Sequence, residues 1–114
     1  MLRHKKNVLV ENFWDCHDGH GLTACQQLLT GVDSTHGLLF FHDDILPPGA
    51  SIGLHKHEGN EEVYFLLEGR ATLLYDGERM PMVAGDISMV ADGHSHGIEN
   101  TSDAPIRLIV VGLA

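Results

Sequence analysis

Short apolar segments alternate with polar turns along most of the chain, and no long segment shows the spacing of an amphipathic helix. Glycine, proline, aspartate and asparagine separate these segments, as they do at turns between strands. The clearest turn is Asp76-Gly77, which predicts a hairpin because glycine tolerates the positive φ of a tight turn. The pattern predicts strands over residues 23–29, 37–45, 51–57, 62–67, 71–75, 79–83, 87–90, 95–99 and 106–111. Many short strands at this spacing predict an all-β sandwich or barrel.

The length and composition are those of one globular domain, expected to span residues 1–114 with an N-terminal arm over about residues 1–22. Of the 114 residues, 43% are hydrophobic and 20% are charged, so a core can form without disulfides. The formal net charge of -9 argues against nucleic acid or a membrane surface as partner, because both bind clustered lysine and arginine. The apolar run "NVLV" is too short for a signal peptide or a membrane span, so a cytoplasmic location is expected.

Two histidines one residue apart, His55 and His57, precede a charged bend and a pair of glutamates. Residues i and i+2 of a strand share a face, so the two imidazoles are expected to project together. Only one of Glu61 and Glu62 can face them, because neighbouring residues of a strand point to opposite faces. Burying two imidazoles and a carboxylate together is costly without a partner, and a divalent metal suits these ligands.

An isolated His-x-His pair is more often part of a solvated loop, so a second cluster is needed to favour a metal. The segment "GDISMVADGHSHGIEN" supplies one, with His94 and His96 on another short strand between Gly93 and Gly97. One more imidazole would complete a set of four ligands. The two clusters together therefore favour a metal site.

At these residues the sequence resembles the cupins. Their first motif, G-x5-H-x-H-x3,4-E-x6-G, is matched over residues 49–69 by Gly49, His55, His57, Glu62 and Gly69. Their second motif, G-x5-P-x-G-x2-H-x3-N, is matched over residues 85–100 by Gly85, Gly93, His96 and Asn100, with Ala91 where the family usually has proline. The short gap between the motifs is typical of small bacterial cupins, and Asn100 is interpreted as a turn residue.

The resemblance implies the family's fold, a double-stranded β-helix or jelly-roll barrel. It implies one divalent transition metal per chain, with Mn or Fe favoured and Zn, Ni or Co as alternatives. The implied ligands are His55, His57, Glu62 and His96, where counting back from the second glycine of the first motif selects Glu62 over Glu61. The motif glycines are expected at turns where other residues would be strained.

Fold alone does not decide activity, because cupins include decarboxylases, dioxygenases, isomerases and binding modules. The motifs most resemble those of small cupins related to oxalate decarboxylase. The favoured function is therefore a metal-dependent enzyme of decarboxylase or dioxygenase type that acts on a small carboxylate. The first alternative is a non-catalytic module that binds or senses a small molecule. The second is a sugar or phosphosugar isomerase, which would need several basic residues near the pocket; Lys56, Arg70 and Arg79 are the nearest in sequence.

An acid–base group for such an enzyme must come from outside the ligand set. His94 is the candidate catalytic residue, because it is an imidazole two residues before the ligand His96 and shares its parity. It also follows Gly93 directly, so the alternative is that it lies in a turn at the rim of the cavity. Glu61 is a weaker candidate for the catalytic residue, since alternation along the strand turns it away from the cavity. Tyr64 is expected on the same face as Glu62, where it either lines the cavity or packs in the core. The remaining histidines are expected on the surface or in loops: His4, His17, His20, His36 and His42. Both cysteines, Cys16 and Cys25, are expected to be free thiols.

We expect a homodimer. The apolar segments "NVLVENFW" and "IRLIVVGLA" would make poor exposed edges of a small barrel, and a two-fold interface would cover them. The alternative is that both segments are interior strands of one subunit. Light scattering at micromolar protein should give the mass of two chains, and a monomer alone at that concentration would refute the dimer.

Overall fold

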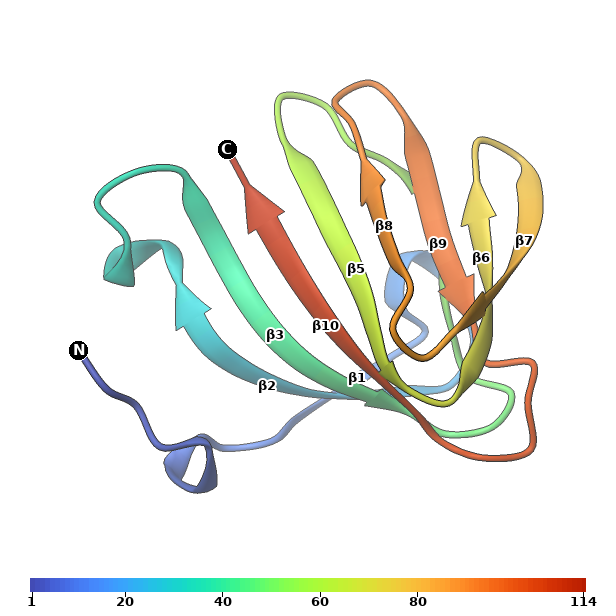
Figure 1. Cartoon of the computed structure of the whole chain (residues 1–114), viewed down its shortest axis with the longest axis horizontal. Helices are drawn as coiled ribbons and strands as arrows, with labels where there is room; N and C mark the ends of the chain where they lie inside the picture. The colour runs from blue at the N-terminus through green and yellow to red at the C-terminus, as the bar shows by residue number, and fades with distance from the viewer.

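The computed structural model describes residues 1–114 and consists of two antiparallel sheets around a common interior (Figure 1). The larger sheet has the strand order β1-β2-β3-β10-β5-β8, and the smaller has the order β4-β9-β6-β7. In chain order the strands are β1 (Glu11–Trp14), β2 (Leu22–Thr30), β3 (Leu38–Leu46), β4 (Ser51–Lys56), β5 (Glu61–Glu68), β6 (Arg70–Tyr75), β7 (Glu78–Val83), β8 (Ile87–Val90), β9 (Ser95–Glu99) and β10 (Ile106–Leu113). Three short 3-10 helices, η1 (Lys5–Asn7), η2 (Cys16–Asp18) and η3 (Gly31–Asp33), lie in the first third of the chain. No helix is long and apolar enough to cross a membrane.

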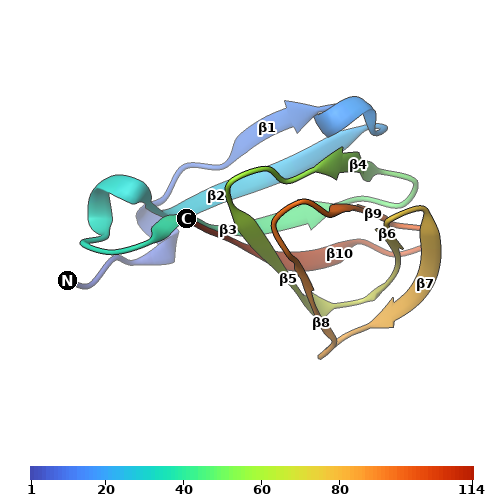
Figure 2. The ribbon, with the colours of Figure 1, turned by 90° about the horizontal axis from the view of Figure 1, so that it is seen from above.

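This architecture confirms the predicted all-β jelly-roll barrel, and Figure 2 shows the smaller sheet lying over the larger one. Every predicted strand is present with ends that differ by at most two residues. The hairpin at Asp76-Gly77 is also present, with φ of 48° and 88°. The motif glycines occupy turns with positive φ, as expected: Gly49, Gly69, Gly85 and Gly93. The sequence pattern did not predict β1 or the 3-10 helices, because these elements are short and exposed.

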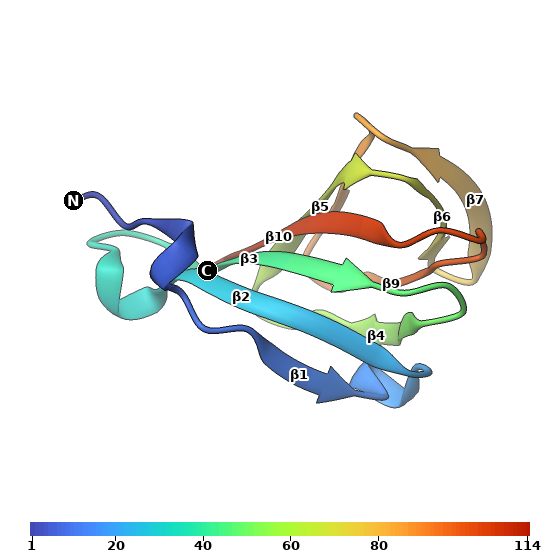
Figure 3. The same cartoon turned by 90° about the horizontal axis from the view of Figure 1, so that it is seen from below.

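The last strand is not an edge. Strand β10 pairs with β3 on one side and with β5 on the other, and the residues at alternating positions along it are buried. The expectation that "IRLIVVGLA" forms an exposed edge was therefore wrong. The argument for a dimer now rests on β1, which lies at the margin of the larger sheet (Figure 3) and exposes Phe13 and Trp14.

The inward-facing positions change from apolar to polar along the barrel. On β5 the buried residues are Leu66, then Tyr64, then Glu62 toward the start of the strand. On β3 the buried Leu46 is followed inward along the same face by Asp44. The apolar ends belong to one hydrophobic core, which includes Leu46, Leu66, Ile98, Ile106 and Leu108. The polar ends are left to form a site in the other half of the barrel.

Ion pairs fasten the N-terminal arm to the outer face of the larger sheet. Asp43 is 3% exposed and bonds to Lys5 at 2.9 Å and to Arg107 at 2.6 Å. Arg3 forms an ion pair at 3.0 Å with Asp33 of η3, the short helix that follows β2. A buried carboxylate with two cationic partners is compensated, so this arm is a defined part of the fold.

Asn100 should be required for stability and not for the interior site. Its buried amide donates to the Leu46 and Ala104 carbonyls at 3.0 and 2.8 Å, and its Oδ1 accepts from the Ser102 hydroxyl. Asn100→Ala leaves these groups without partners and should lower the free energy of unfolding by about 3 kcal/mol in urea titrations. Asp103→Asn, which changes an exposed side chain in the same loop, is the control and should change it by less than about 0.5 kcal/mol. Equal effects of the two variants would contradict this reading of Asn100.

Candidate metal centre

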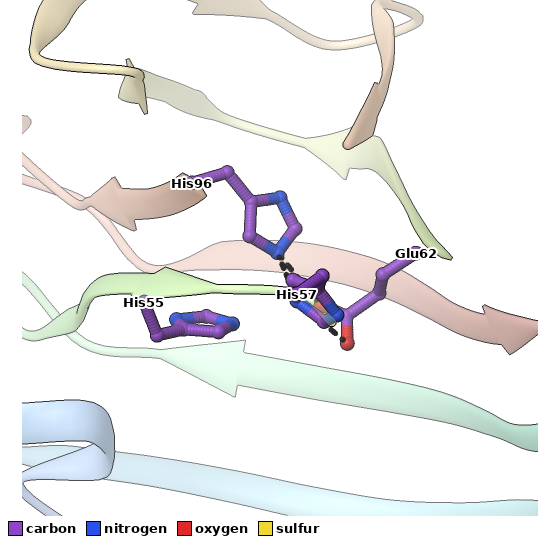
Figure 4. A group of neighbouring side chains, drawn as sticks. All are labelled: His55, His57, Glu62 and His96. Atoms are coloured by element: carbon purple, nitrogen blue, oxygen red, sulfur yellow. Dashed lines mark hydrogen bonds and ion pairs between the residues drawn. The ribbon is translucent and has the colours of Figure 1, made fainter. Parts of the chain in front are cut away.

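Three histidines and one glutamate converge inside the barrel from three neighbouring segments (Figure 4). His55 on β4 and His96 on β9 are Cα partners of the same antiparallel pair. His57 follows two residues after His55 and shares its face. Glu62 enters from the start of β5. The structure thus brings together the four residues selected from the motifs, and Glu62 rather than Glu61 is the glutamate among them.

The donor atoms of these four side chains lie close together. His96 Nε2 is 3.1 Å from Glu62 Oε1 and 3.1 Å from His57 Nε2. One potential ligand atom from each of the four residues lies within 4.8 Å of the others. Four nitrogen and oxygen donors at such separations can surround a single ion.

Hydrogen bonds from outside the cluster fix the protons of two imidazoles. His55 Nδ1 donates to the Gly53 carbonyl at 2.7 Å, and His57 Nδ1 donates to Asn60 Oδ1 at 2.6 Å. Because both oxygens act as acceptors, each Nδ1 carries the proton and each Nε2 keeps a lone pair directed into the cluster. Metal-binding histidines are typically oriented by bonds of this kind, so the donor set fits a divalent transition metal.

His96 differs from the other two histidines in which ring nitrogen carries the proton. Its ring is fully buried and stacks on Tyr64 with centroids 4.1 Å apart, and its Nδ1 has no hydrogen-bond partner. Without an ion, Nε2 must carry the proton, because Glu62 Oε1 and His57 Nε2 next to it can only accept. Coordination through Nε2 would transfer this proton to Nδ1.

Burial favours the neutral forms of His55 and His96. It lowers the pKa of His55 to about 4 and lowers the pKa of His96 as well, although Glu62 acts in the opposite direction on both. Neutral imidazole is the form that binds metals. The cluster is therefore ready to accept a cation at neutral pH.

The cluster borders a cavity of about 580 Å³. His55, His57 and Glu62 reach it directly, and its apolar lining includes Phe13, Phe40, Ile52 and Val110. Lys56 is the one lysine or arginine in the lining, and it pairs with Glu58 at 3.3 Å. A small anion in this cavity would therefore find little positive charge from the chain itself.

His17 covers the cluster from the outside. Its ring stacks on that of His55 with centroids 3.7 Å apart and an interplanar angle of 13°. It belongs to η2, where Asp15, His17 and Asp18 all have left-handed φ, between 51° and 59°, a conformation that costs energy in residues other than glycine. The turn lies so close to β4 that a Cβ on Gly53 would collide with the His17 carbonyl oxygen. The sequence correctly placed His17 in a loop but gave no sign of this contact.

His94 lies outside the cluster. It precedes β9 in a turn, where its N–H bonds to the Ala91 carbonyl, and its exposed ring bonds to Asp76 at 2.6 Å. It does not line the cavity, so its acid–base role stays a prediction. Tyr64 meets both of its expectations, since it is fully buried against His96 and also lines the cavity.

Sequence reasoning missed a second group of polar side chains at the same cavity, formed by Cys25, His42 and Asp44. The expectation that His42 lies on the surface or in a loop was wrong, because it is half-buried on β3. The signal was available, since His42 and Asp44 are two residues apart in a predicted strand and so share a face. Both cysteines are free, as expected.

This fold and the four-residue site are those of a cupin, and the family comparison agrees. The family described as "Cupin domain" matches residues 43–112, and the chain therefore belongs to the cupin family.

Individual relatives resemble the chain over nearly its full length. It is 32% identical to the oxalate-binding protein of Thermotoga maritima over 111 residues, which are 97% of this chain and 92% of the relative. A crystal structure described as a predicted oxalate decarboxylase from T. maritima superposes with a TM-score of 0.95, at 32% identity, covering 99% of this chain and 98% of that one. The polyketide cyclase RemF from Streptomyces resistomycificus shares the fold at 22% identity, with a TM-score of 0.81, covering 99% of this chain and 79% of that one.

Asp44 should give the metal-free protein a distinctive pH dependence. Burial raises the pKa of this carboxyl to about 7 in the folded state. At pH values between the pKa of Asp44 in the unfolded chain and about 7, the carboxyl is therefore protonated in the folded state and ionised in the unfolded state. This contribution to stability is present at low pH and is lost as the pH rises through about 7. Relative to Asp44→Asn, the wild type should therefore lose about 3 kcal/mol of unfolding free energy between about pH 4 and about pH 8. Urea unfolding with chelator present measures this, and parallel pH profiles of the two proteins would contradict it.

Proposed function

We propose that this cupin holds one divalent metal on His55, His57, Glu62 and His96 and acts there on a small carboxylate, by decarboxylation or by reaction with O2. The observation that carries the proposal is the convergence of four donors in which two imidazoles have their Nε2 lone pairs fixed toward the cluster. Manganese or iron is the metal we favour, and zinc, nickel and cobalt suit the same donors.

A bound divalent ion would supply the positive charge that holds carboxylate oxygens and withdraws electrons from them. The chain provides the surroundings for this charge. Glu62 offsets part of it, Asn60 and the Gly53 carbonyl hold the imidazole rings in place, and apolar side chains form part of the cavity lining. The nearby oxalate-binding relative supports a carboxylate as the ligand.

The charge distribution disfavours the isomerase alternative. A phosphosugar needs several basic side chains, and of the three candidates only Lys56 lines the cavity. Arg79 bonds to Glu99 at 2.7 Å, and Arg70 is exposed and outside the lining. A non-catalytic carboxylate-binding cupin remains the second candidate, favoured by the function given for the T. maritima relative.

An enzyme of this kind needs a proton-transferring group that is not a ligand. His94 is our sequence-based candidate, and His17 is added because its ring lies against His55 and lines the cavity. Either imidazole would have to reach the substrate from the mouth of the cavity. We also propose a homodimer, formed through β1 with its exposed Phe13 and Trp14.

The metal assignment is tested by a matched pair of histidines. His96→Ala removes a buried ligand, so the purified variant should retain less than about a tenth of the wild-type metal content and lose the drop in Tm on chelation. His94→Ala removes an exposed ring from the turn just before the same strand and should keep both properties. Elemental analysis and thermal denaturation measure them. Full metal content in His96→Ala would refute the assignment.

The ligand is tested by calorimetric titration of oxalate into metal-loaded and metal-free protein. Binding should require the metal, because the cavity otherwise offers little positive charge. Assays for loss of oxalate, with and without O2, then separate the two candidates. Turnover supports the enzyme, whereas tight metal-dependent binding without turnover supports the binding module.

A further inference from the structure

Cys25, His42 and Asp44 form a compact group because of the register between two strands. Cys25 on β2 and Asp44 on β3 are Cα partners, and His42 lies two residues before Asp44 on the same face. Their potential ligand atoms all lie within 4.8 Å of one another. The group is thus a direct product of the sheet, not of a flexible loop.

The same construction produces the first cluster. There, His55 and His57 are two residues apart on or just after one strand, and His96 is the cross-strand partner of His55. The first cluster takes its histidines from the smaller sheet, and the second group lies in the larger sheet. Both groups line the same cavity. The barrel therefore presents two clusters of potential metal ligands, one with histidines of the smaller sheet and Glu62 of the larger sheet, and one from the larger sheet alone.

The second group is buried without a compensating charge. Cys25 is 2% exposed and Asp44 is 4% exposed, and Asp44 Oδ1 has no hydrogen-bond partner. The neighbouring Asp43, in contrast, is neutralised by Lys5 and Arg107 on the outer face of the sheet. A buried carboxyl with an unpaired oxygen points to a missing partner.

Burial favours the uncharged forms of all three side chains in this group. Burial raises the pKa of the Cys25 thiol well above its usual range, and the adjacent Asp44 raises it further. Burial also raises the pKa of Asp44 to about 7 and lowers that of His42. A thiol held in the protonated state is a poor nucleophile, so the group is poorly suited to nucleophilic catalysis. A nearby divalent cation would reverse the effects on the thiol and the carboxyl.

We propose that Cys25, His42 and Asp44 are a second metal site, for zinc or a similar divalent ion, separate from the four-residue centre. Sulfur, nitrogen and carboxylate oxygen are the donors that zinc takes, and three protein ligands leave a coordination position for a small molecule. Binding displaces the Cys25 proton, and the Asp44 proton where it is present, into solvent. The two charges of the ion are then balanced by one thiolate and one carboxylate, so the buried site becomes neutral.

Cobalt(II) tests this site, because a thiolate ligand gives cobalt a charge-transfer absorption in the near ultraviolet that imidazole and carboxylate ligands do not. Titration of cobalt(II) alone into metal-free wild-type protein should produce this band together with binding of a second equivalent. Added zinc should remove the band. Wild-type protein that takes up cobalt without the band would overturn the proposal.

Variants identify the ligands. Cys25→Ser and Asp44→Asn should each lose the second equivalent, and Cys25→Ser should lose the band completely. Cys16→Ser is the matched control, since Cys16 also lines the cavity, and it should keep the band. A band lost in Cys16→Ser and kept in Cys25→Ser would refute the assignment. His96→Ala should keep the band while losing the first equivalent, so failure of the first centre is distinguished from failure of this one.

Discussion

The pairing of β4 with β9 is the constraint on which the interior site depends. It sets His55 opposite His96, and His57 joins them from just past the end of β4, where its backbone N–H bonds to the His94 carbonyl. If the pairing of β9 with β4 shifted by one residue, His96 would point out of the barrel and an adjacent residue of β9 would point into it. Gly97, in the middle of β9, supports this register because a Cβ there would collide with the Ile52 carbonyl oxygen on β4. The position of three donors is thus decided by backbone pairing.

Charge gives the second constraint. The chain has a formal net charge of -9, and its cavity contains carboxyl groups without a nearby arginine. Elsewhere the fold compensates its buried charge, as the partners of Asp43 show. In the cavity Glu58 pairs with Lys56, but Glu62 and Asp44 have no lysine or arginine partner. This contrast separates the structural ion pairs from the groups that we assign to ligands.

The sequence was sufficient for the strands of the barrel, because these depend on local features, whereas the four-residue cluster was assembled from two separate motifs through their resemblance to the cupins. Strand alternation, turn residues and motif spacing all act within about 20 residues along the chain. It was insufficient for the contact of His17 with His55 and for the pairing of Cys25 with Asp44, which depend on segments far apart in the chain, whereas the place of His42 on a strand could have been predicted from alternation. Parity also gave His94 the same face as His96, but alternation holds only inside a strand, and His94 lies in the preceding turn. Whether residue 94 takes part in proton transfer is a question for kinetics.

The close approach of η2 to β4 has a consequence for redesign. The turn touches the barrel through backbone atoms, because Gly19 and Gly53 leave no room for a side chain between them. The side chain of Cys16 packs against the hydrophobic core, whereas Asp15, His17 and Asp18 are exposed and need residues that tolerate left-handed φ. A combinatorial library over these three positions, restricted to Asn, Asp, His and Gly, could vary the entrance of the cavity while the hydrophobic core and both sheets stay unchanged.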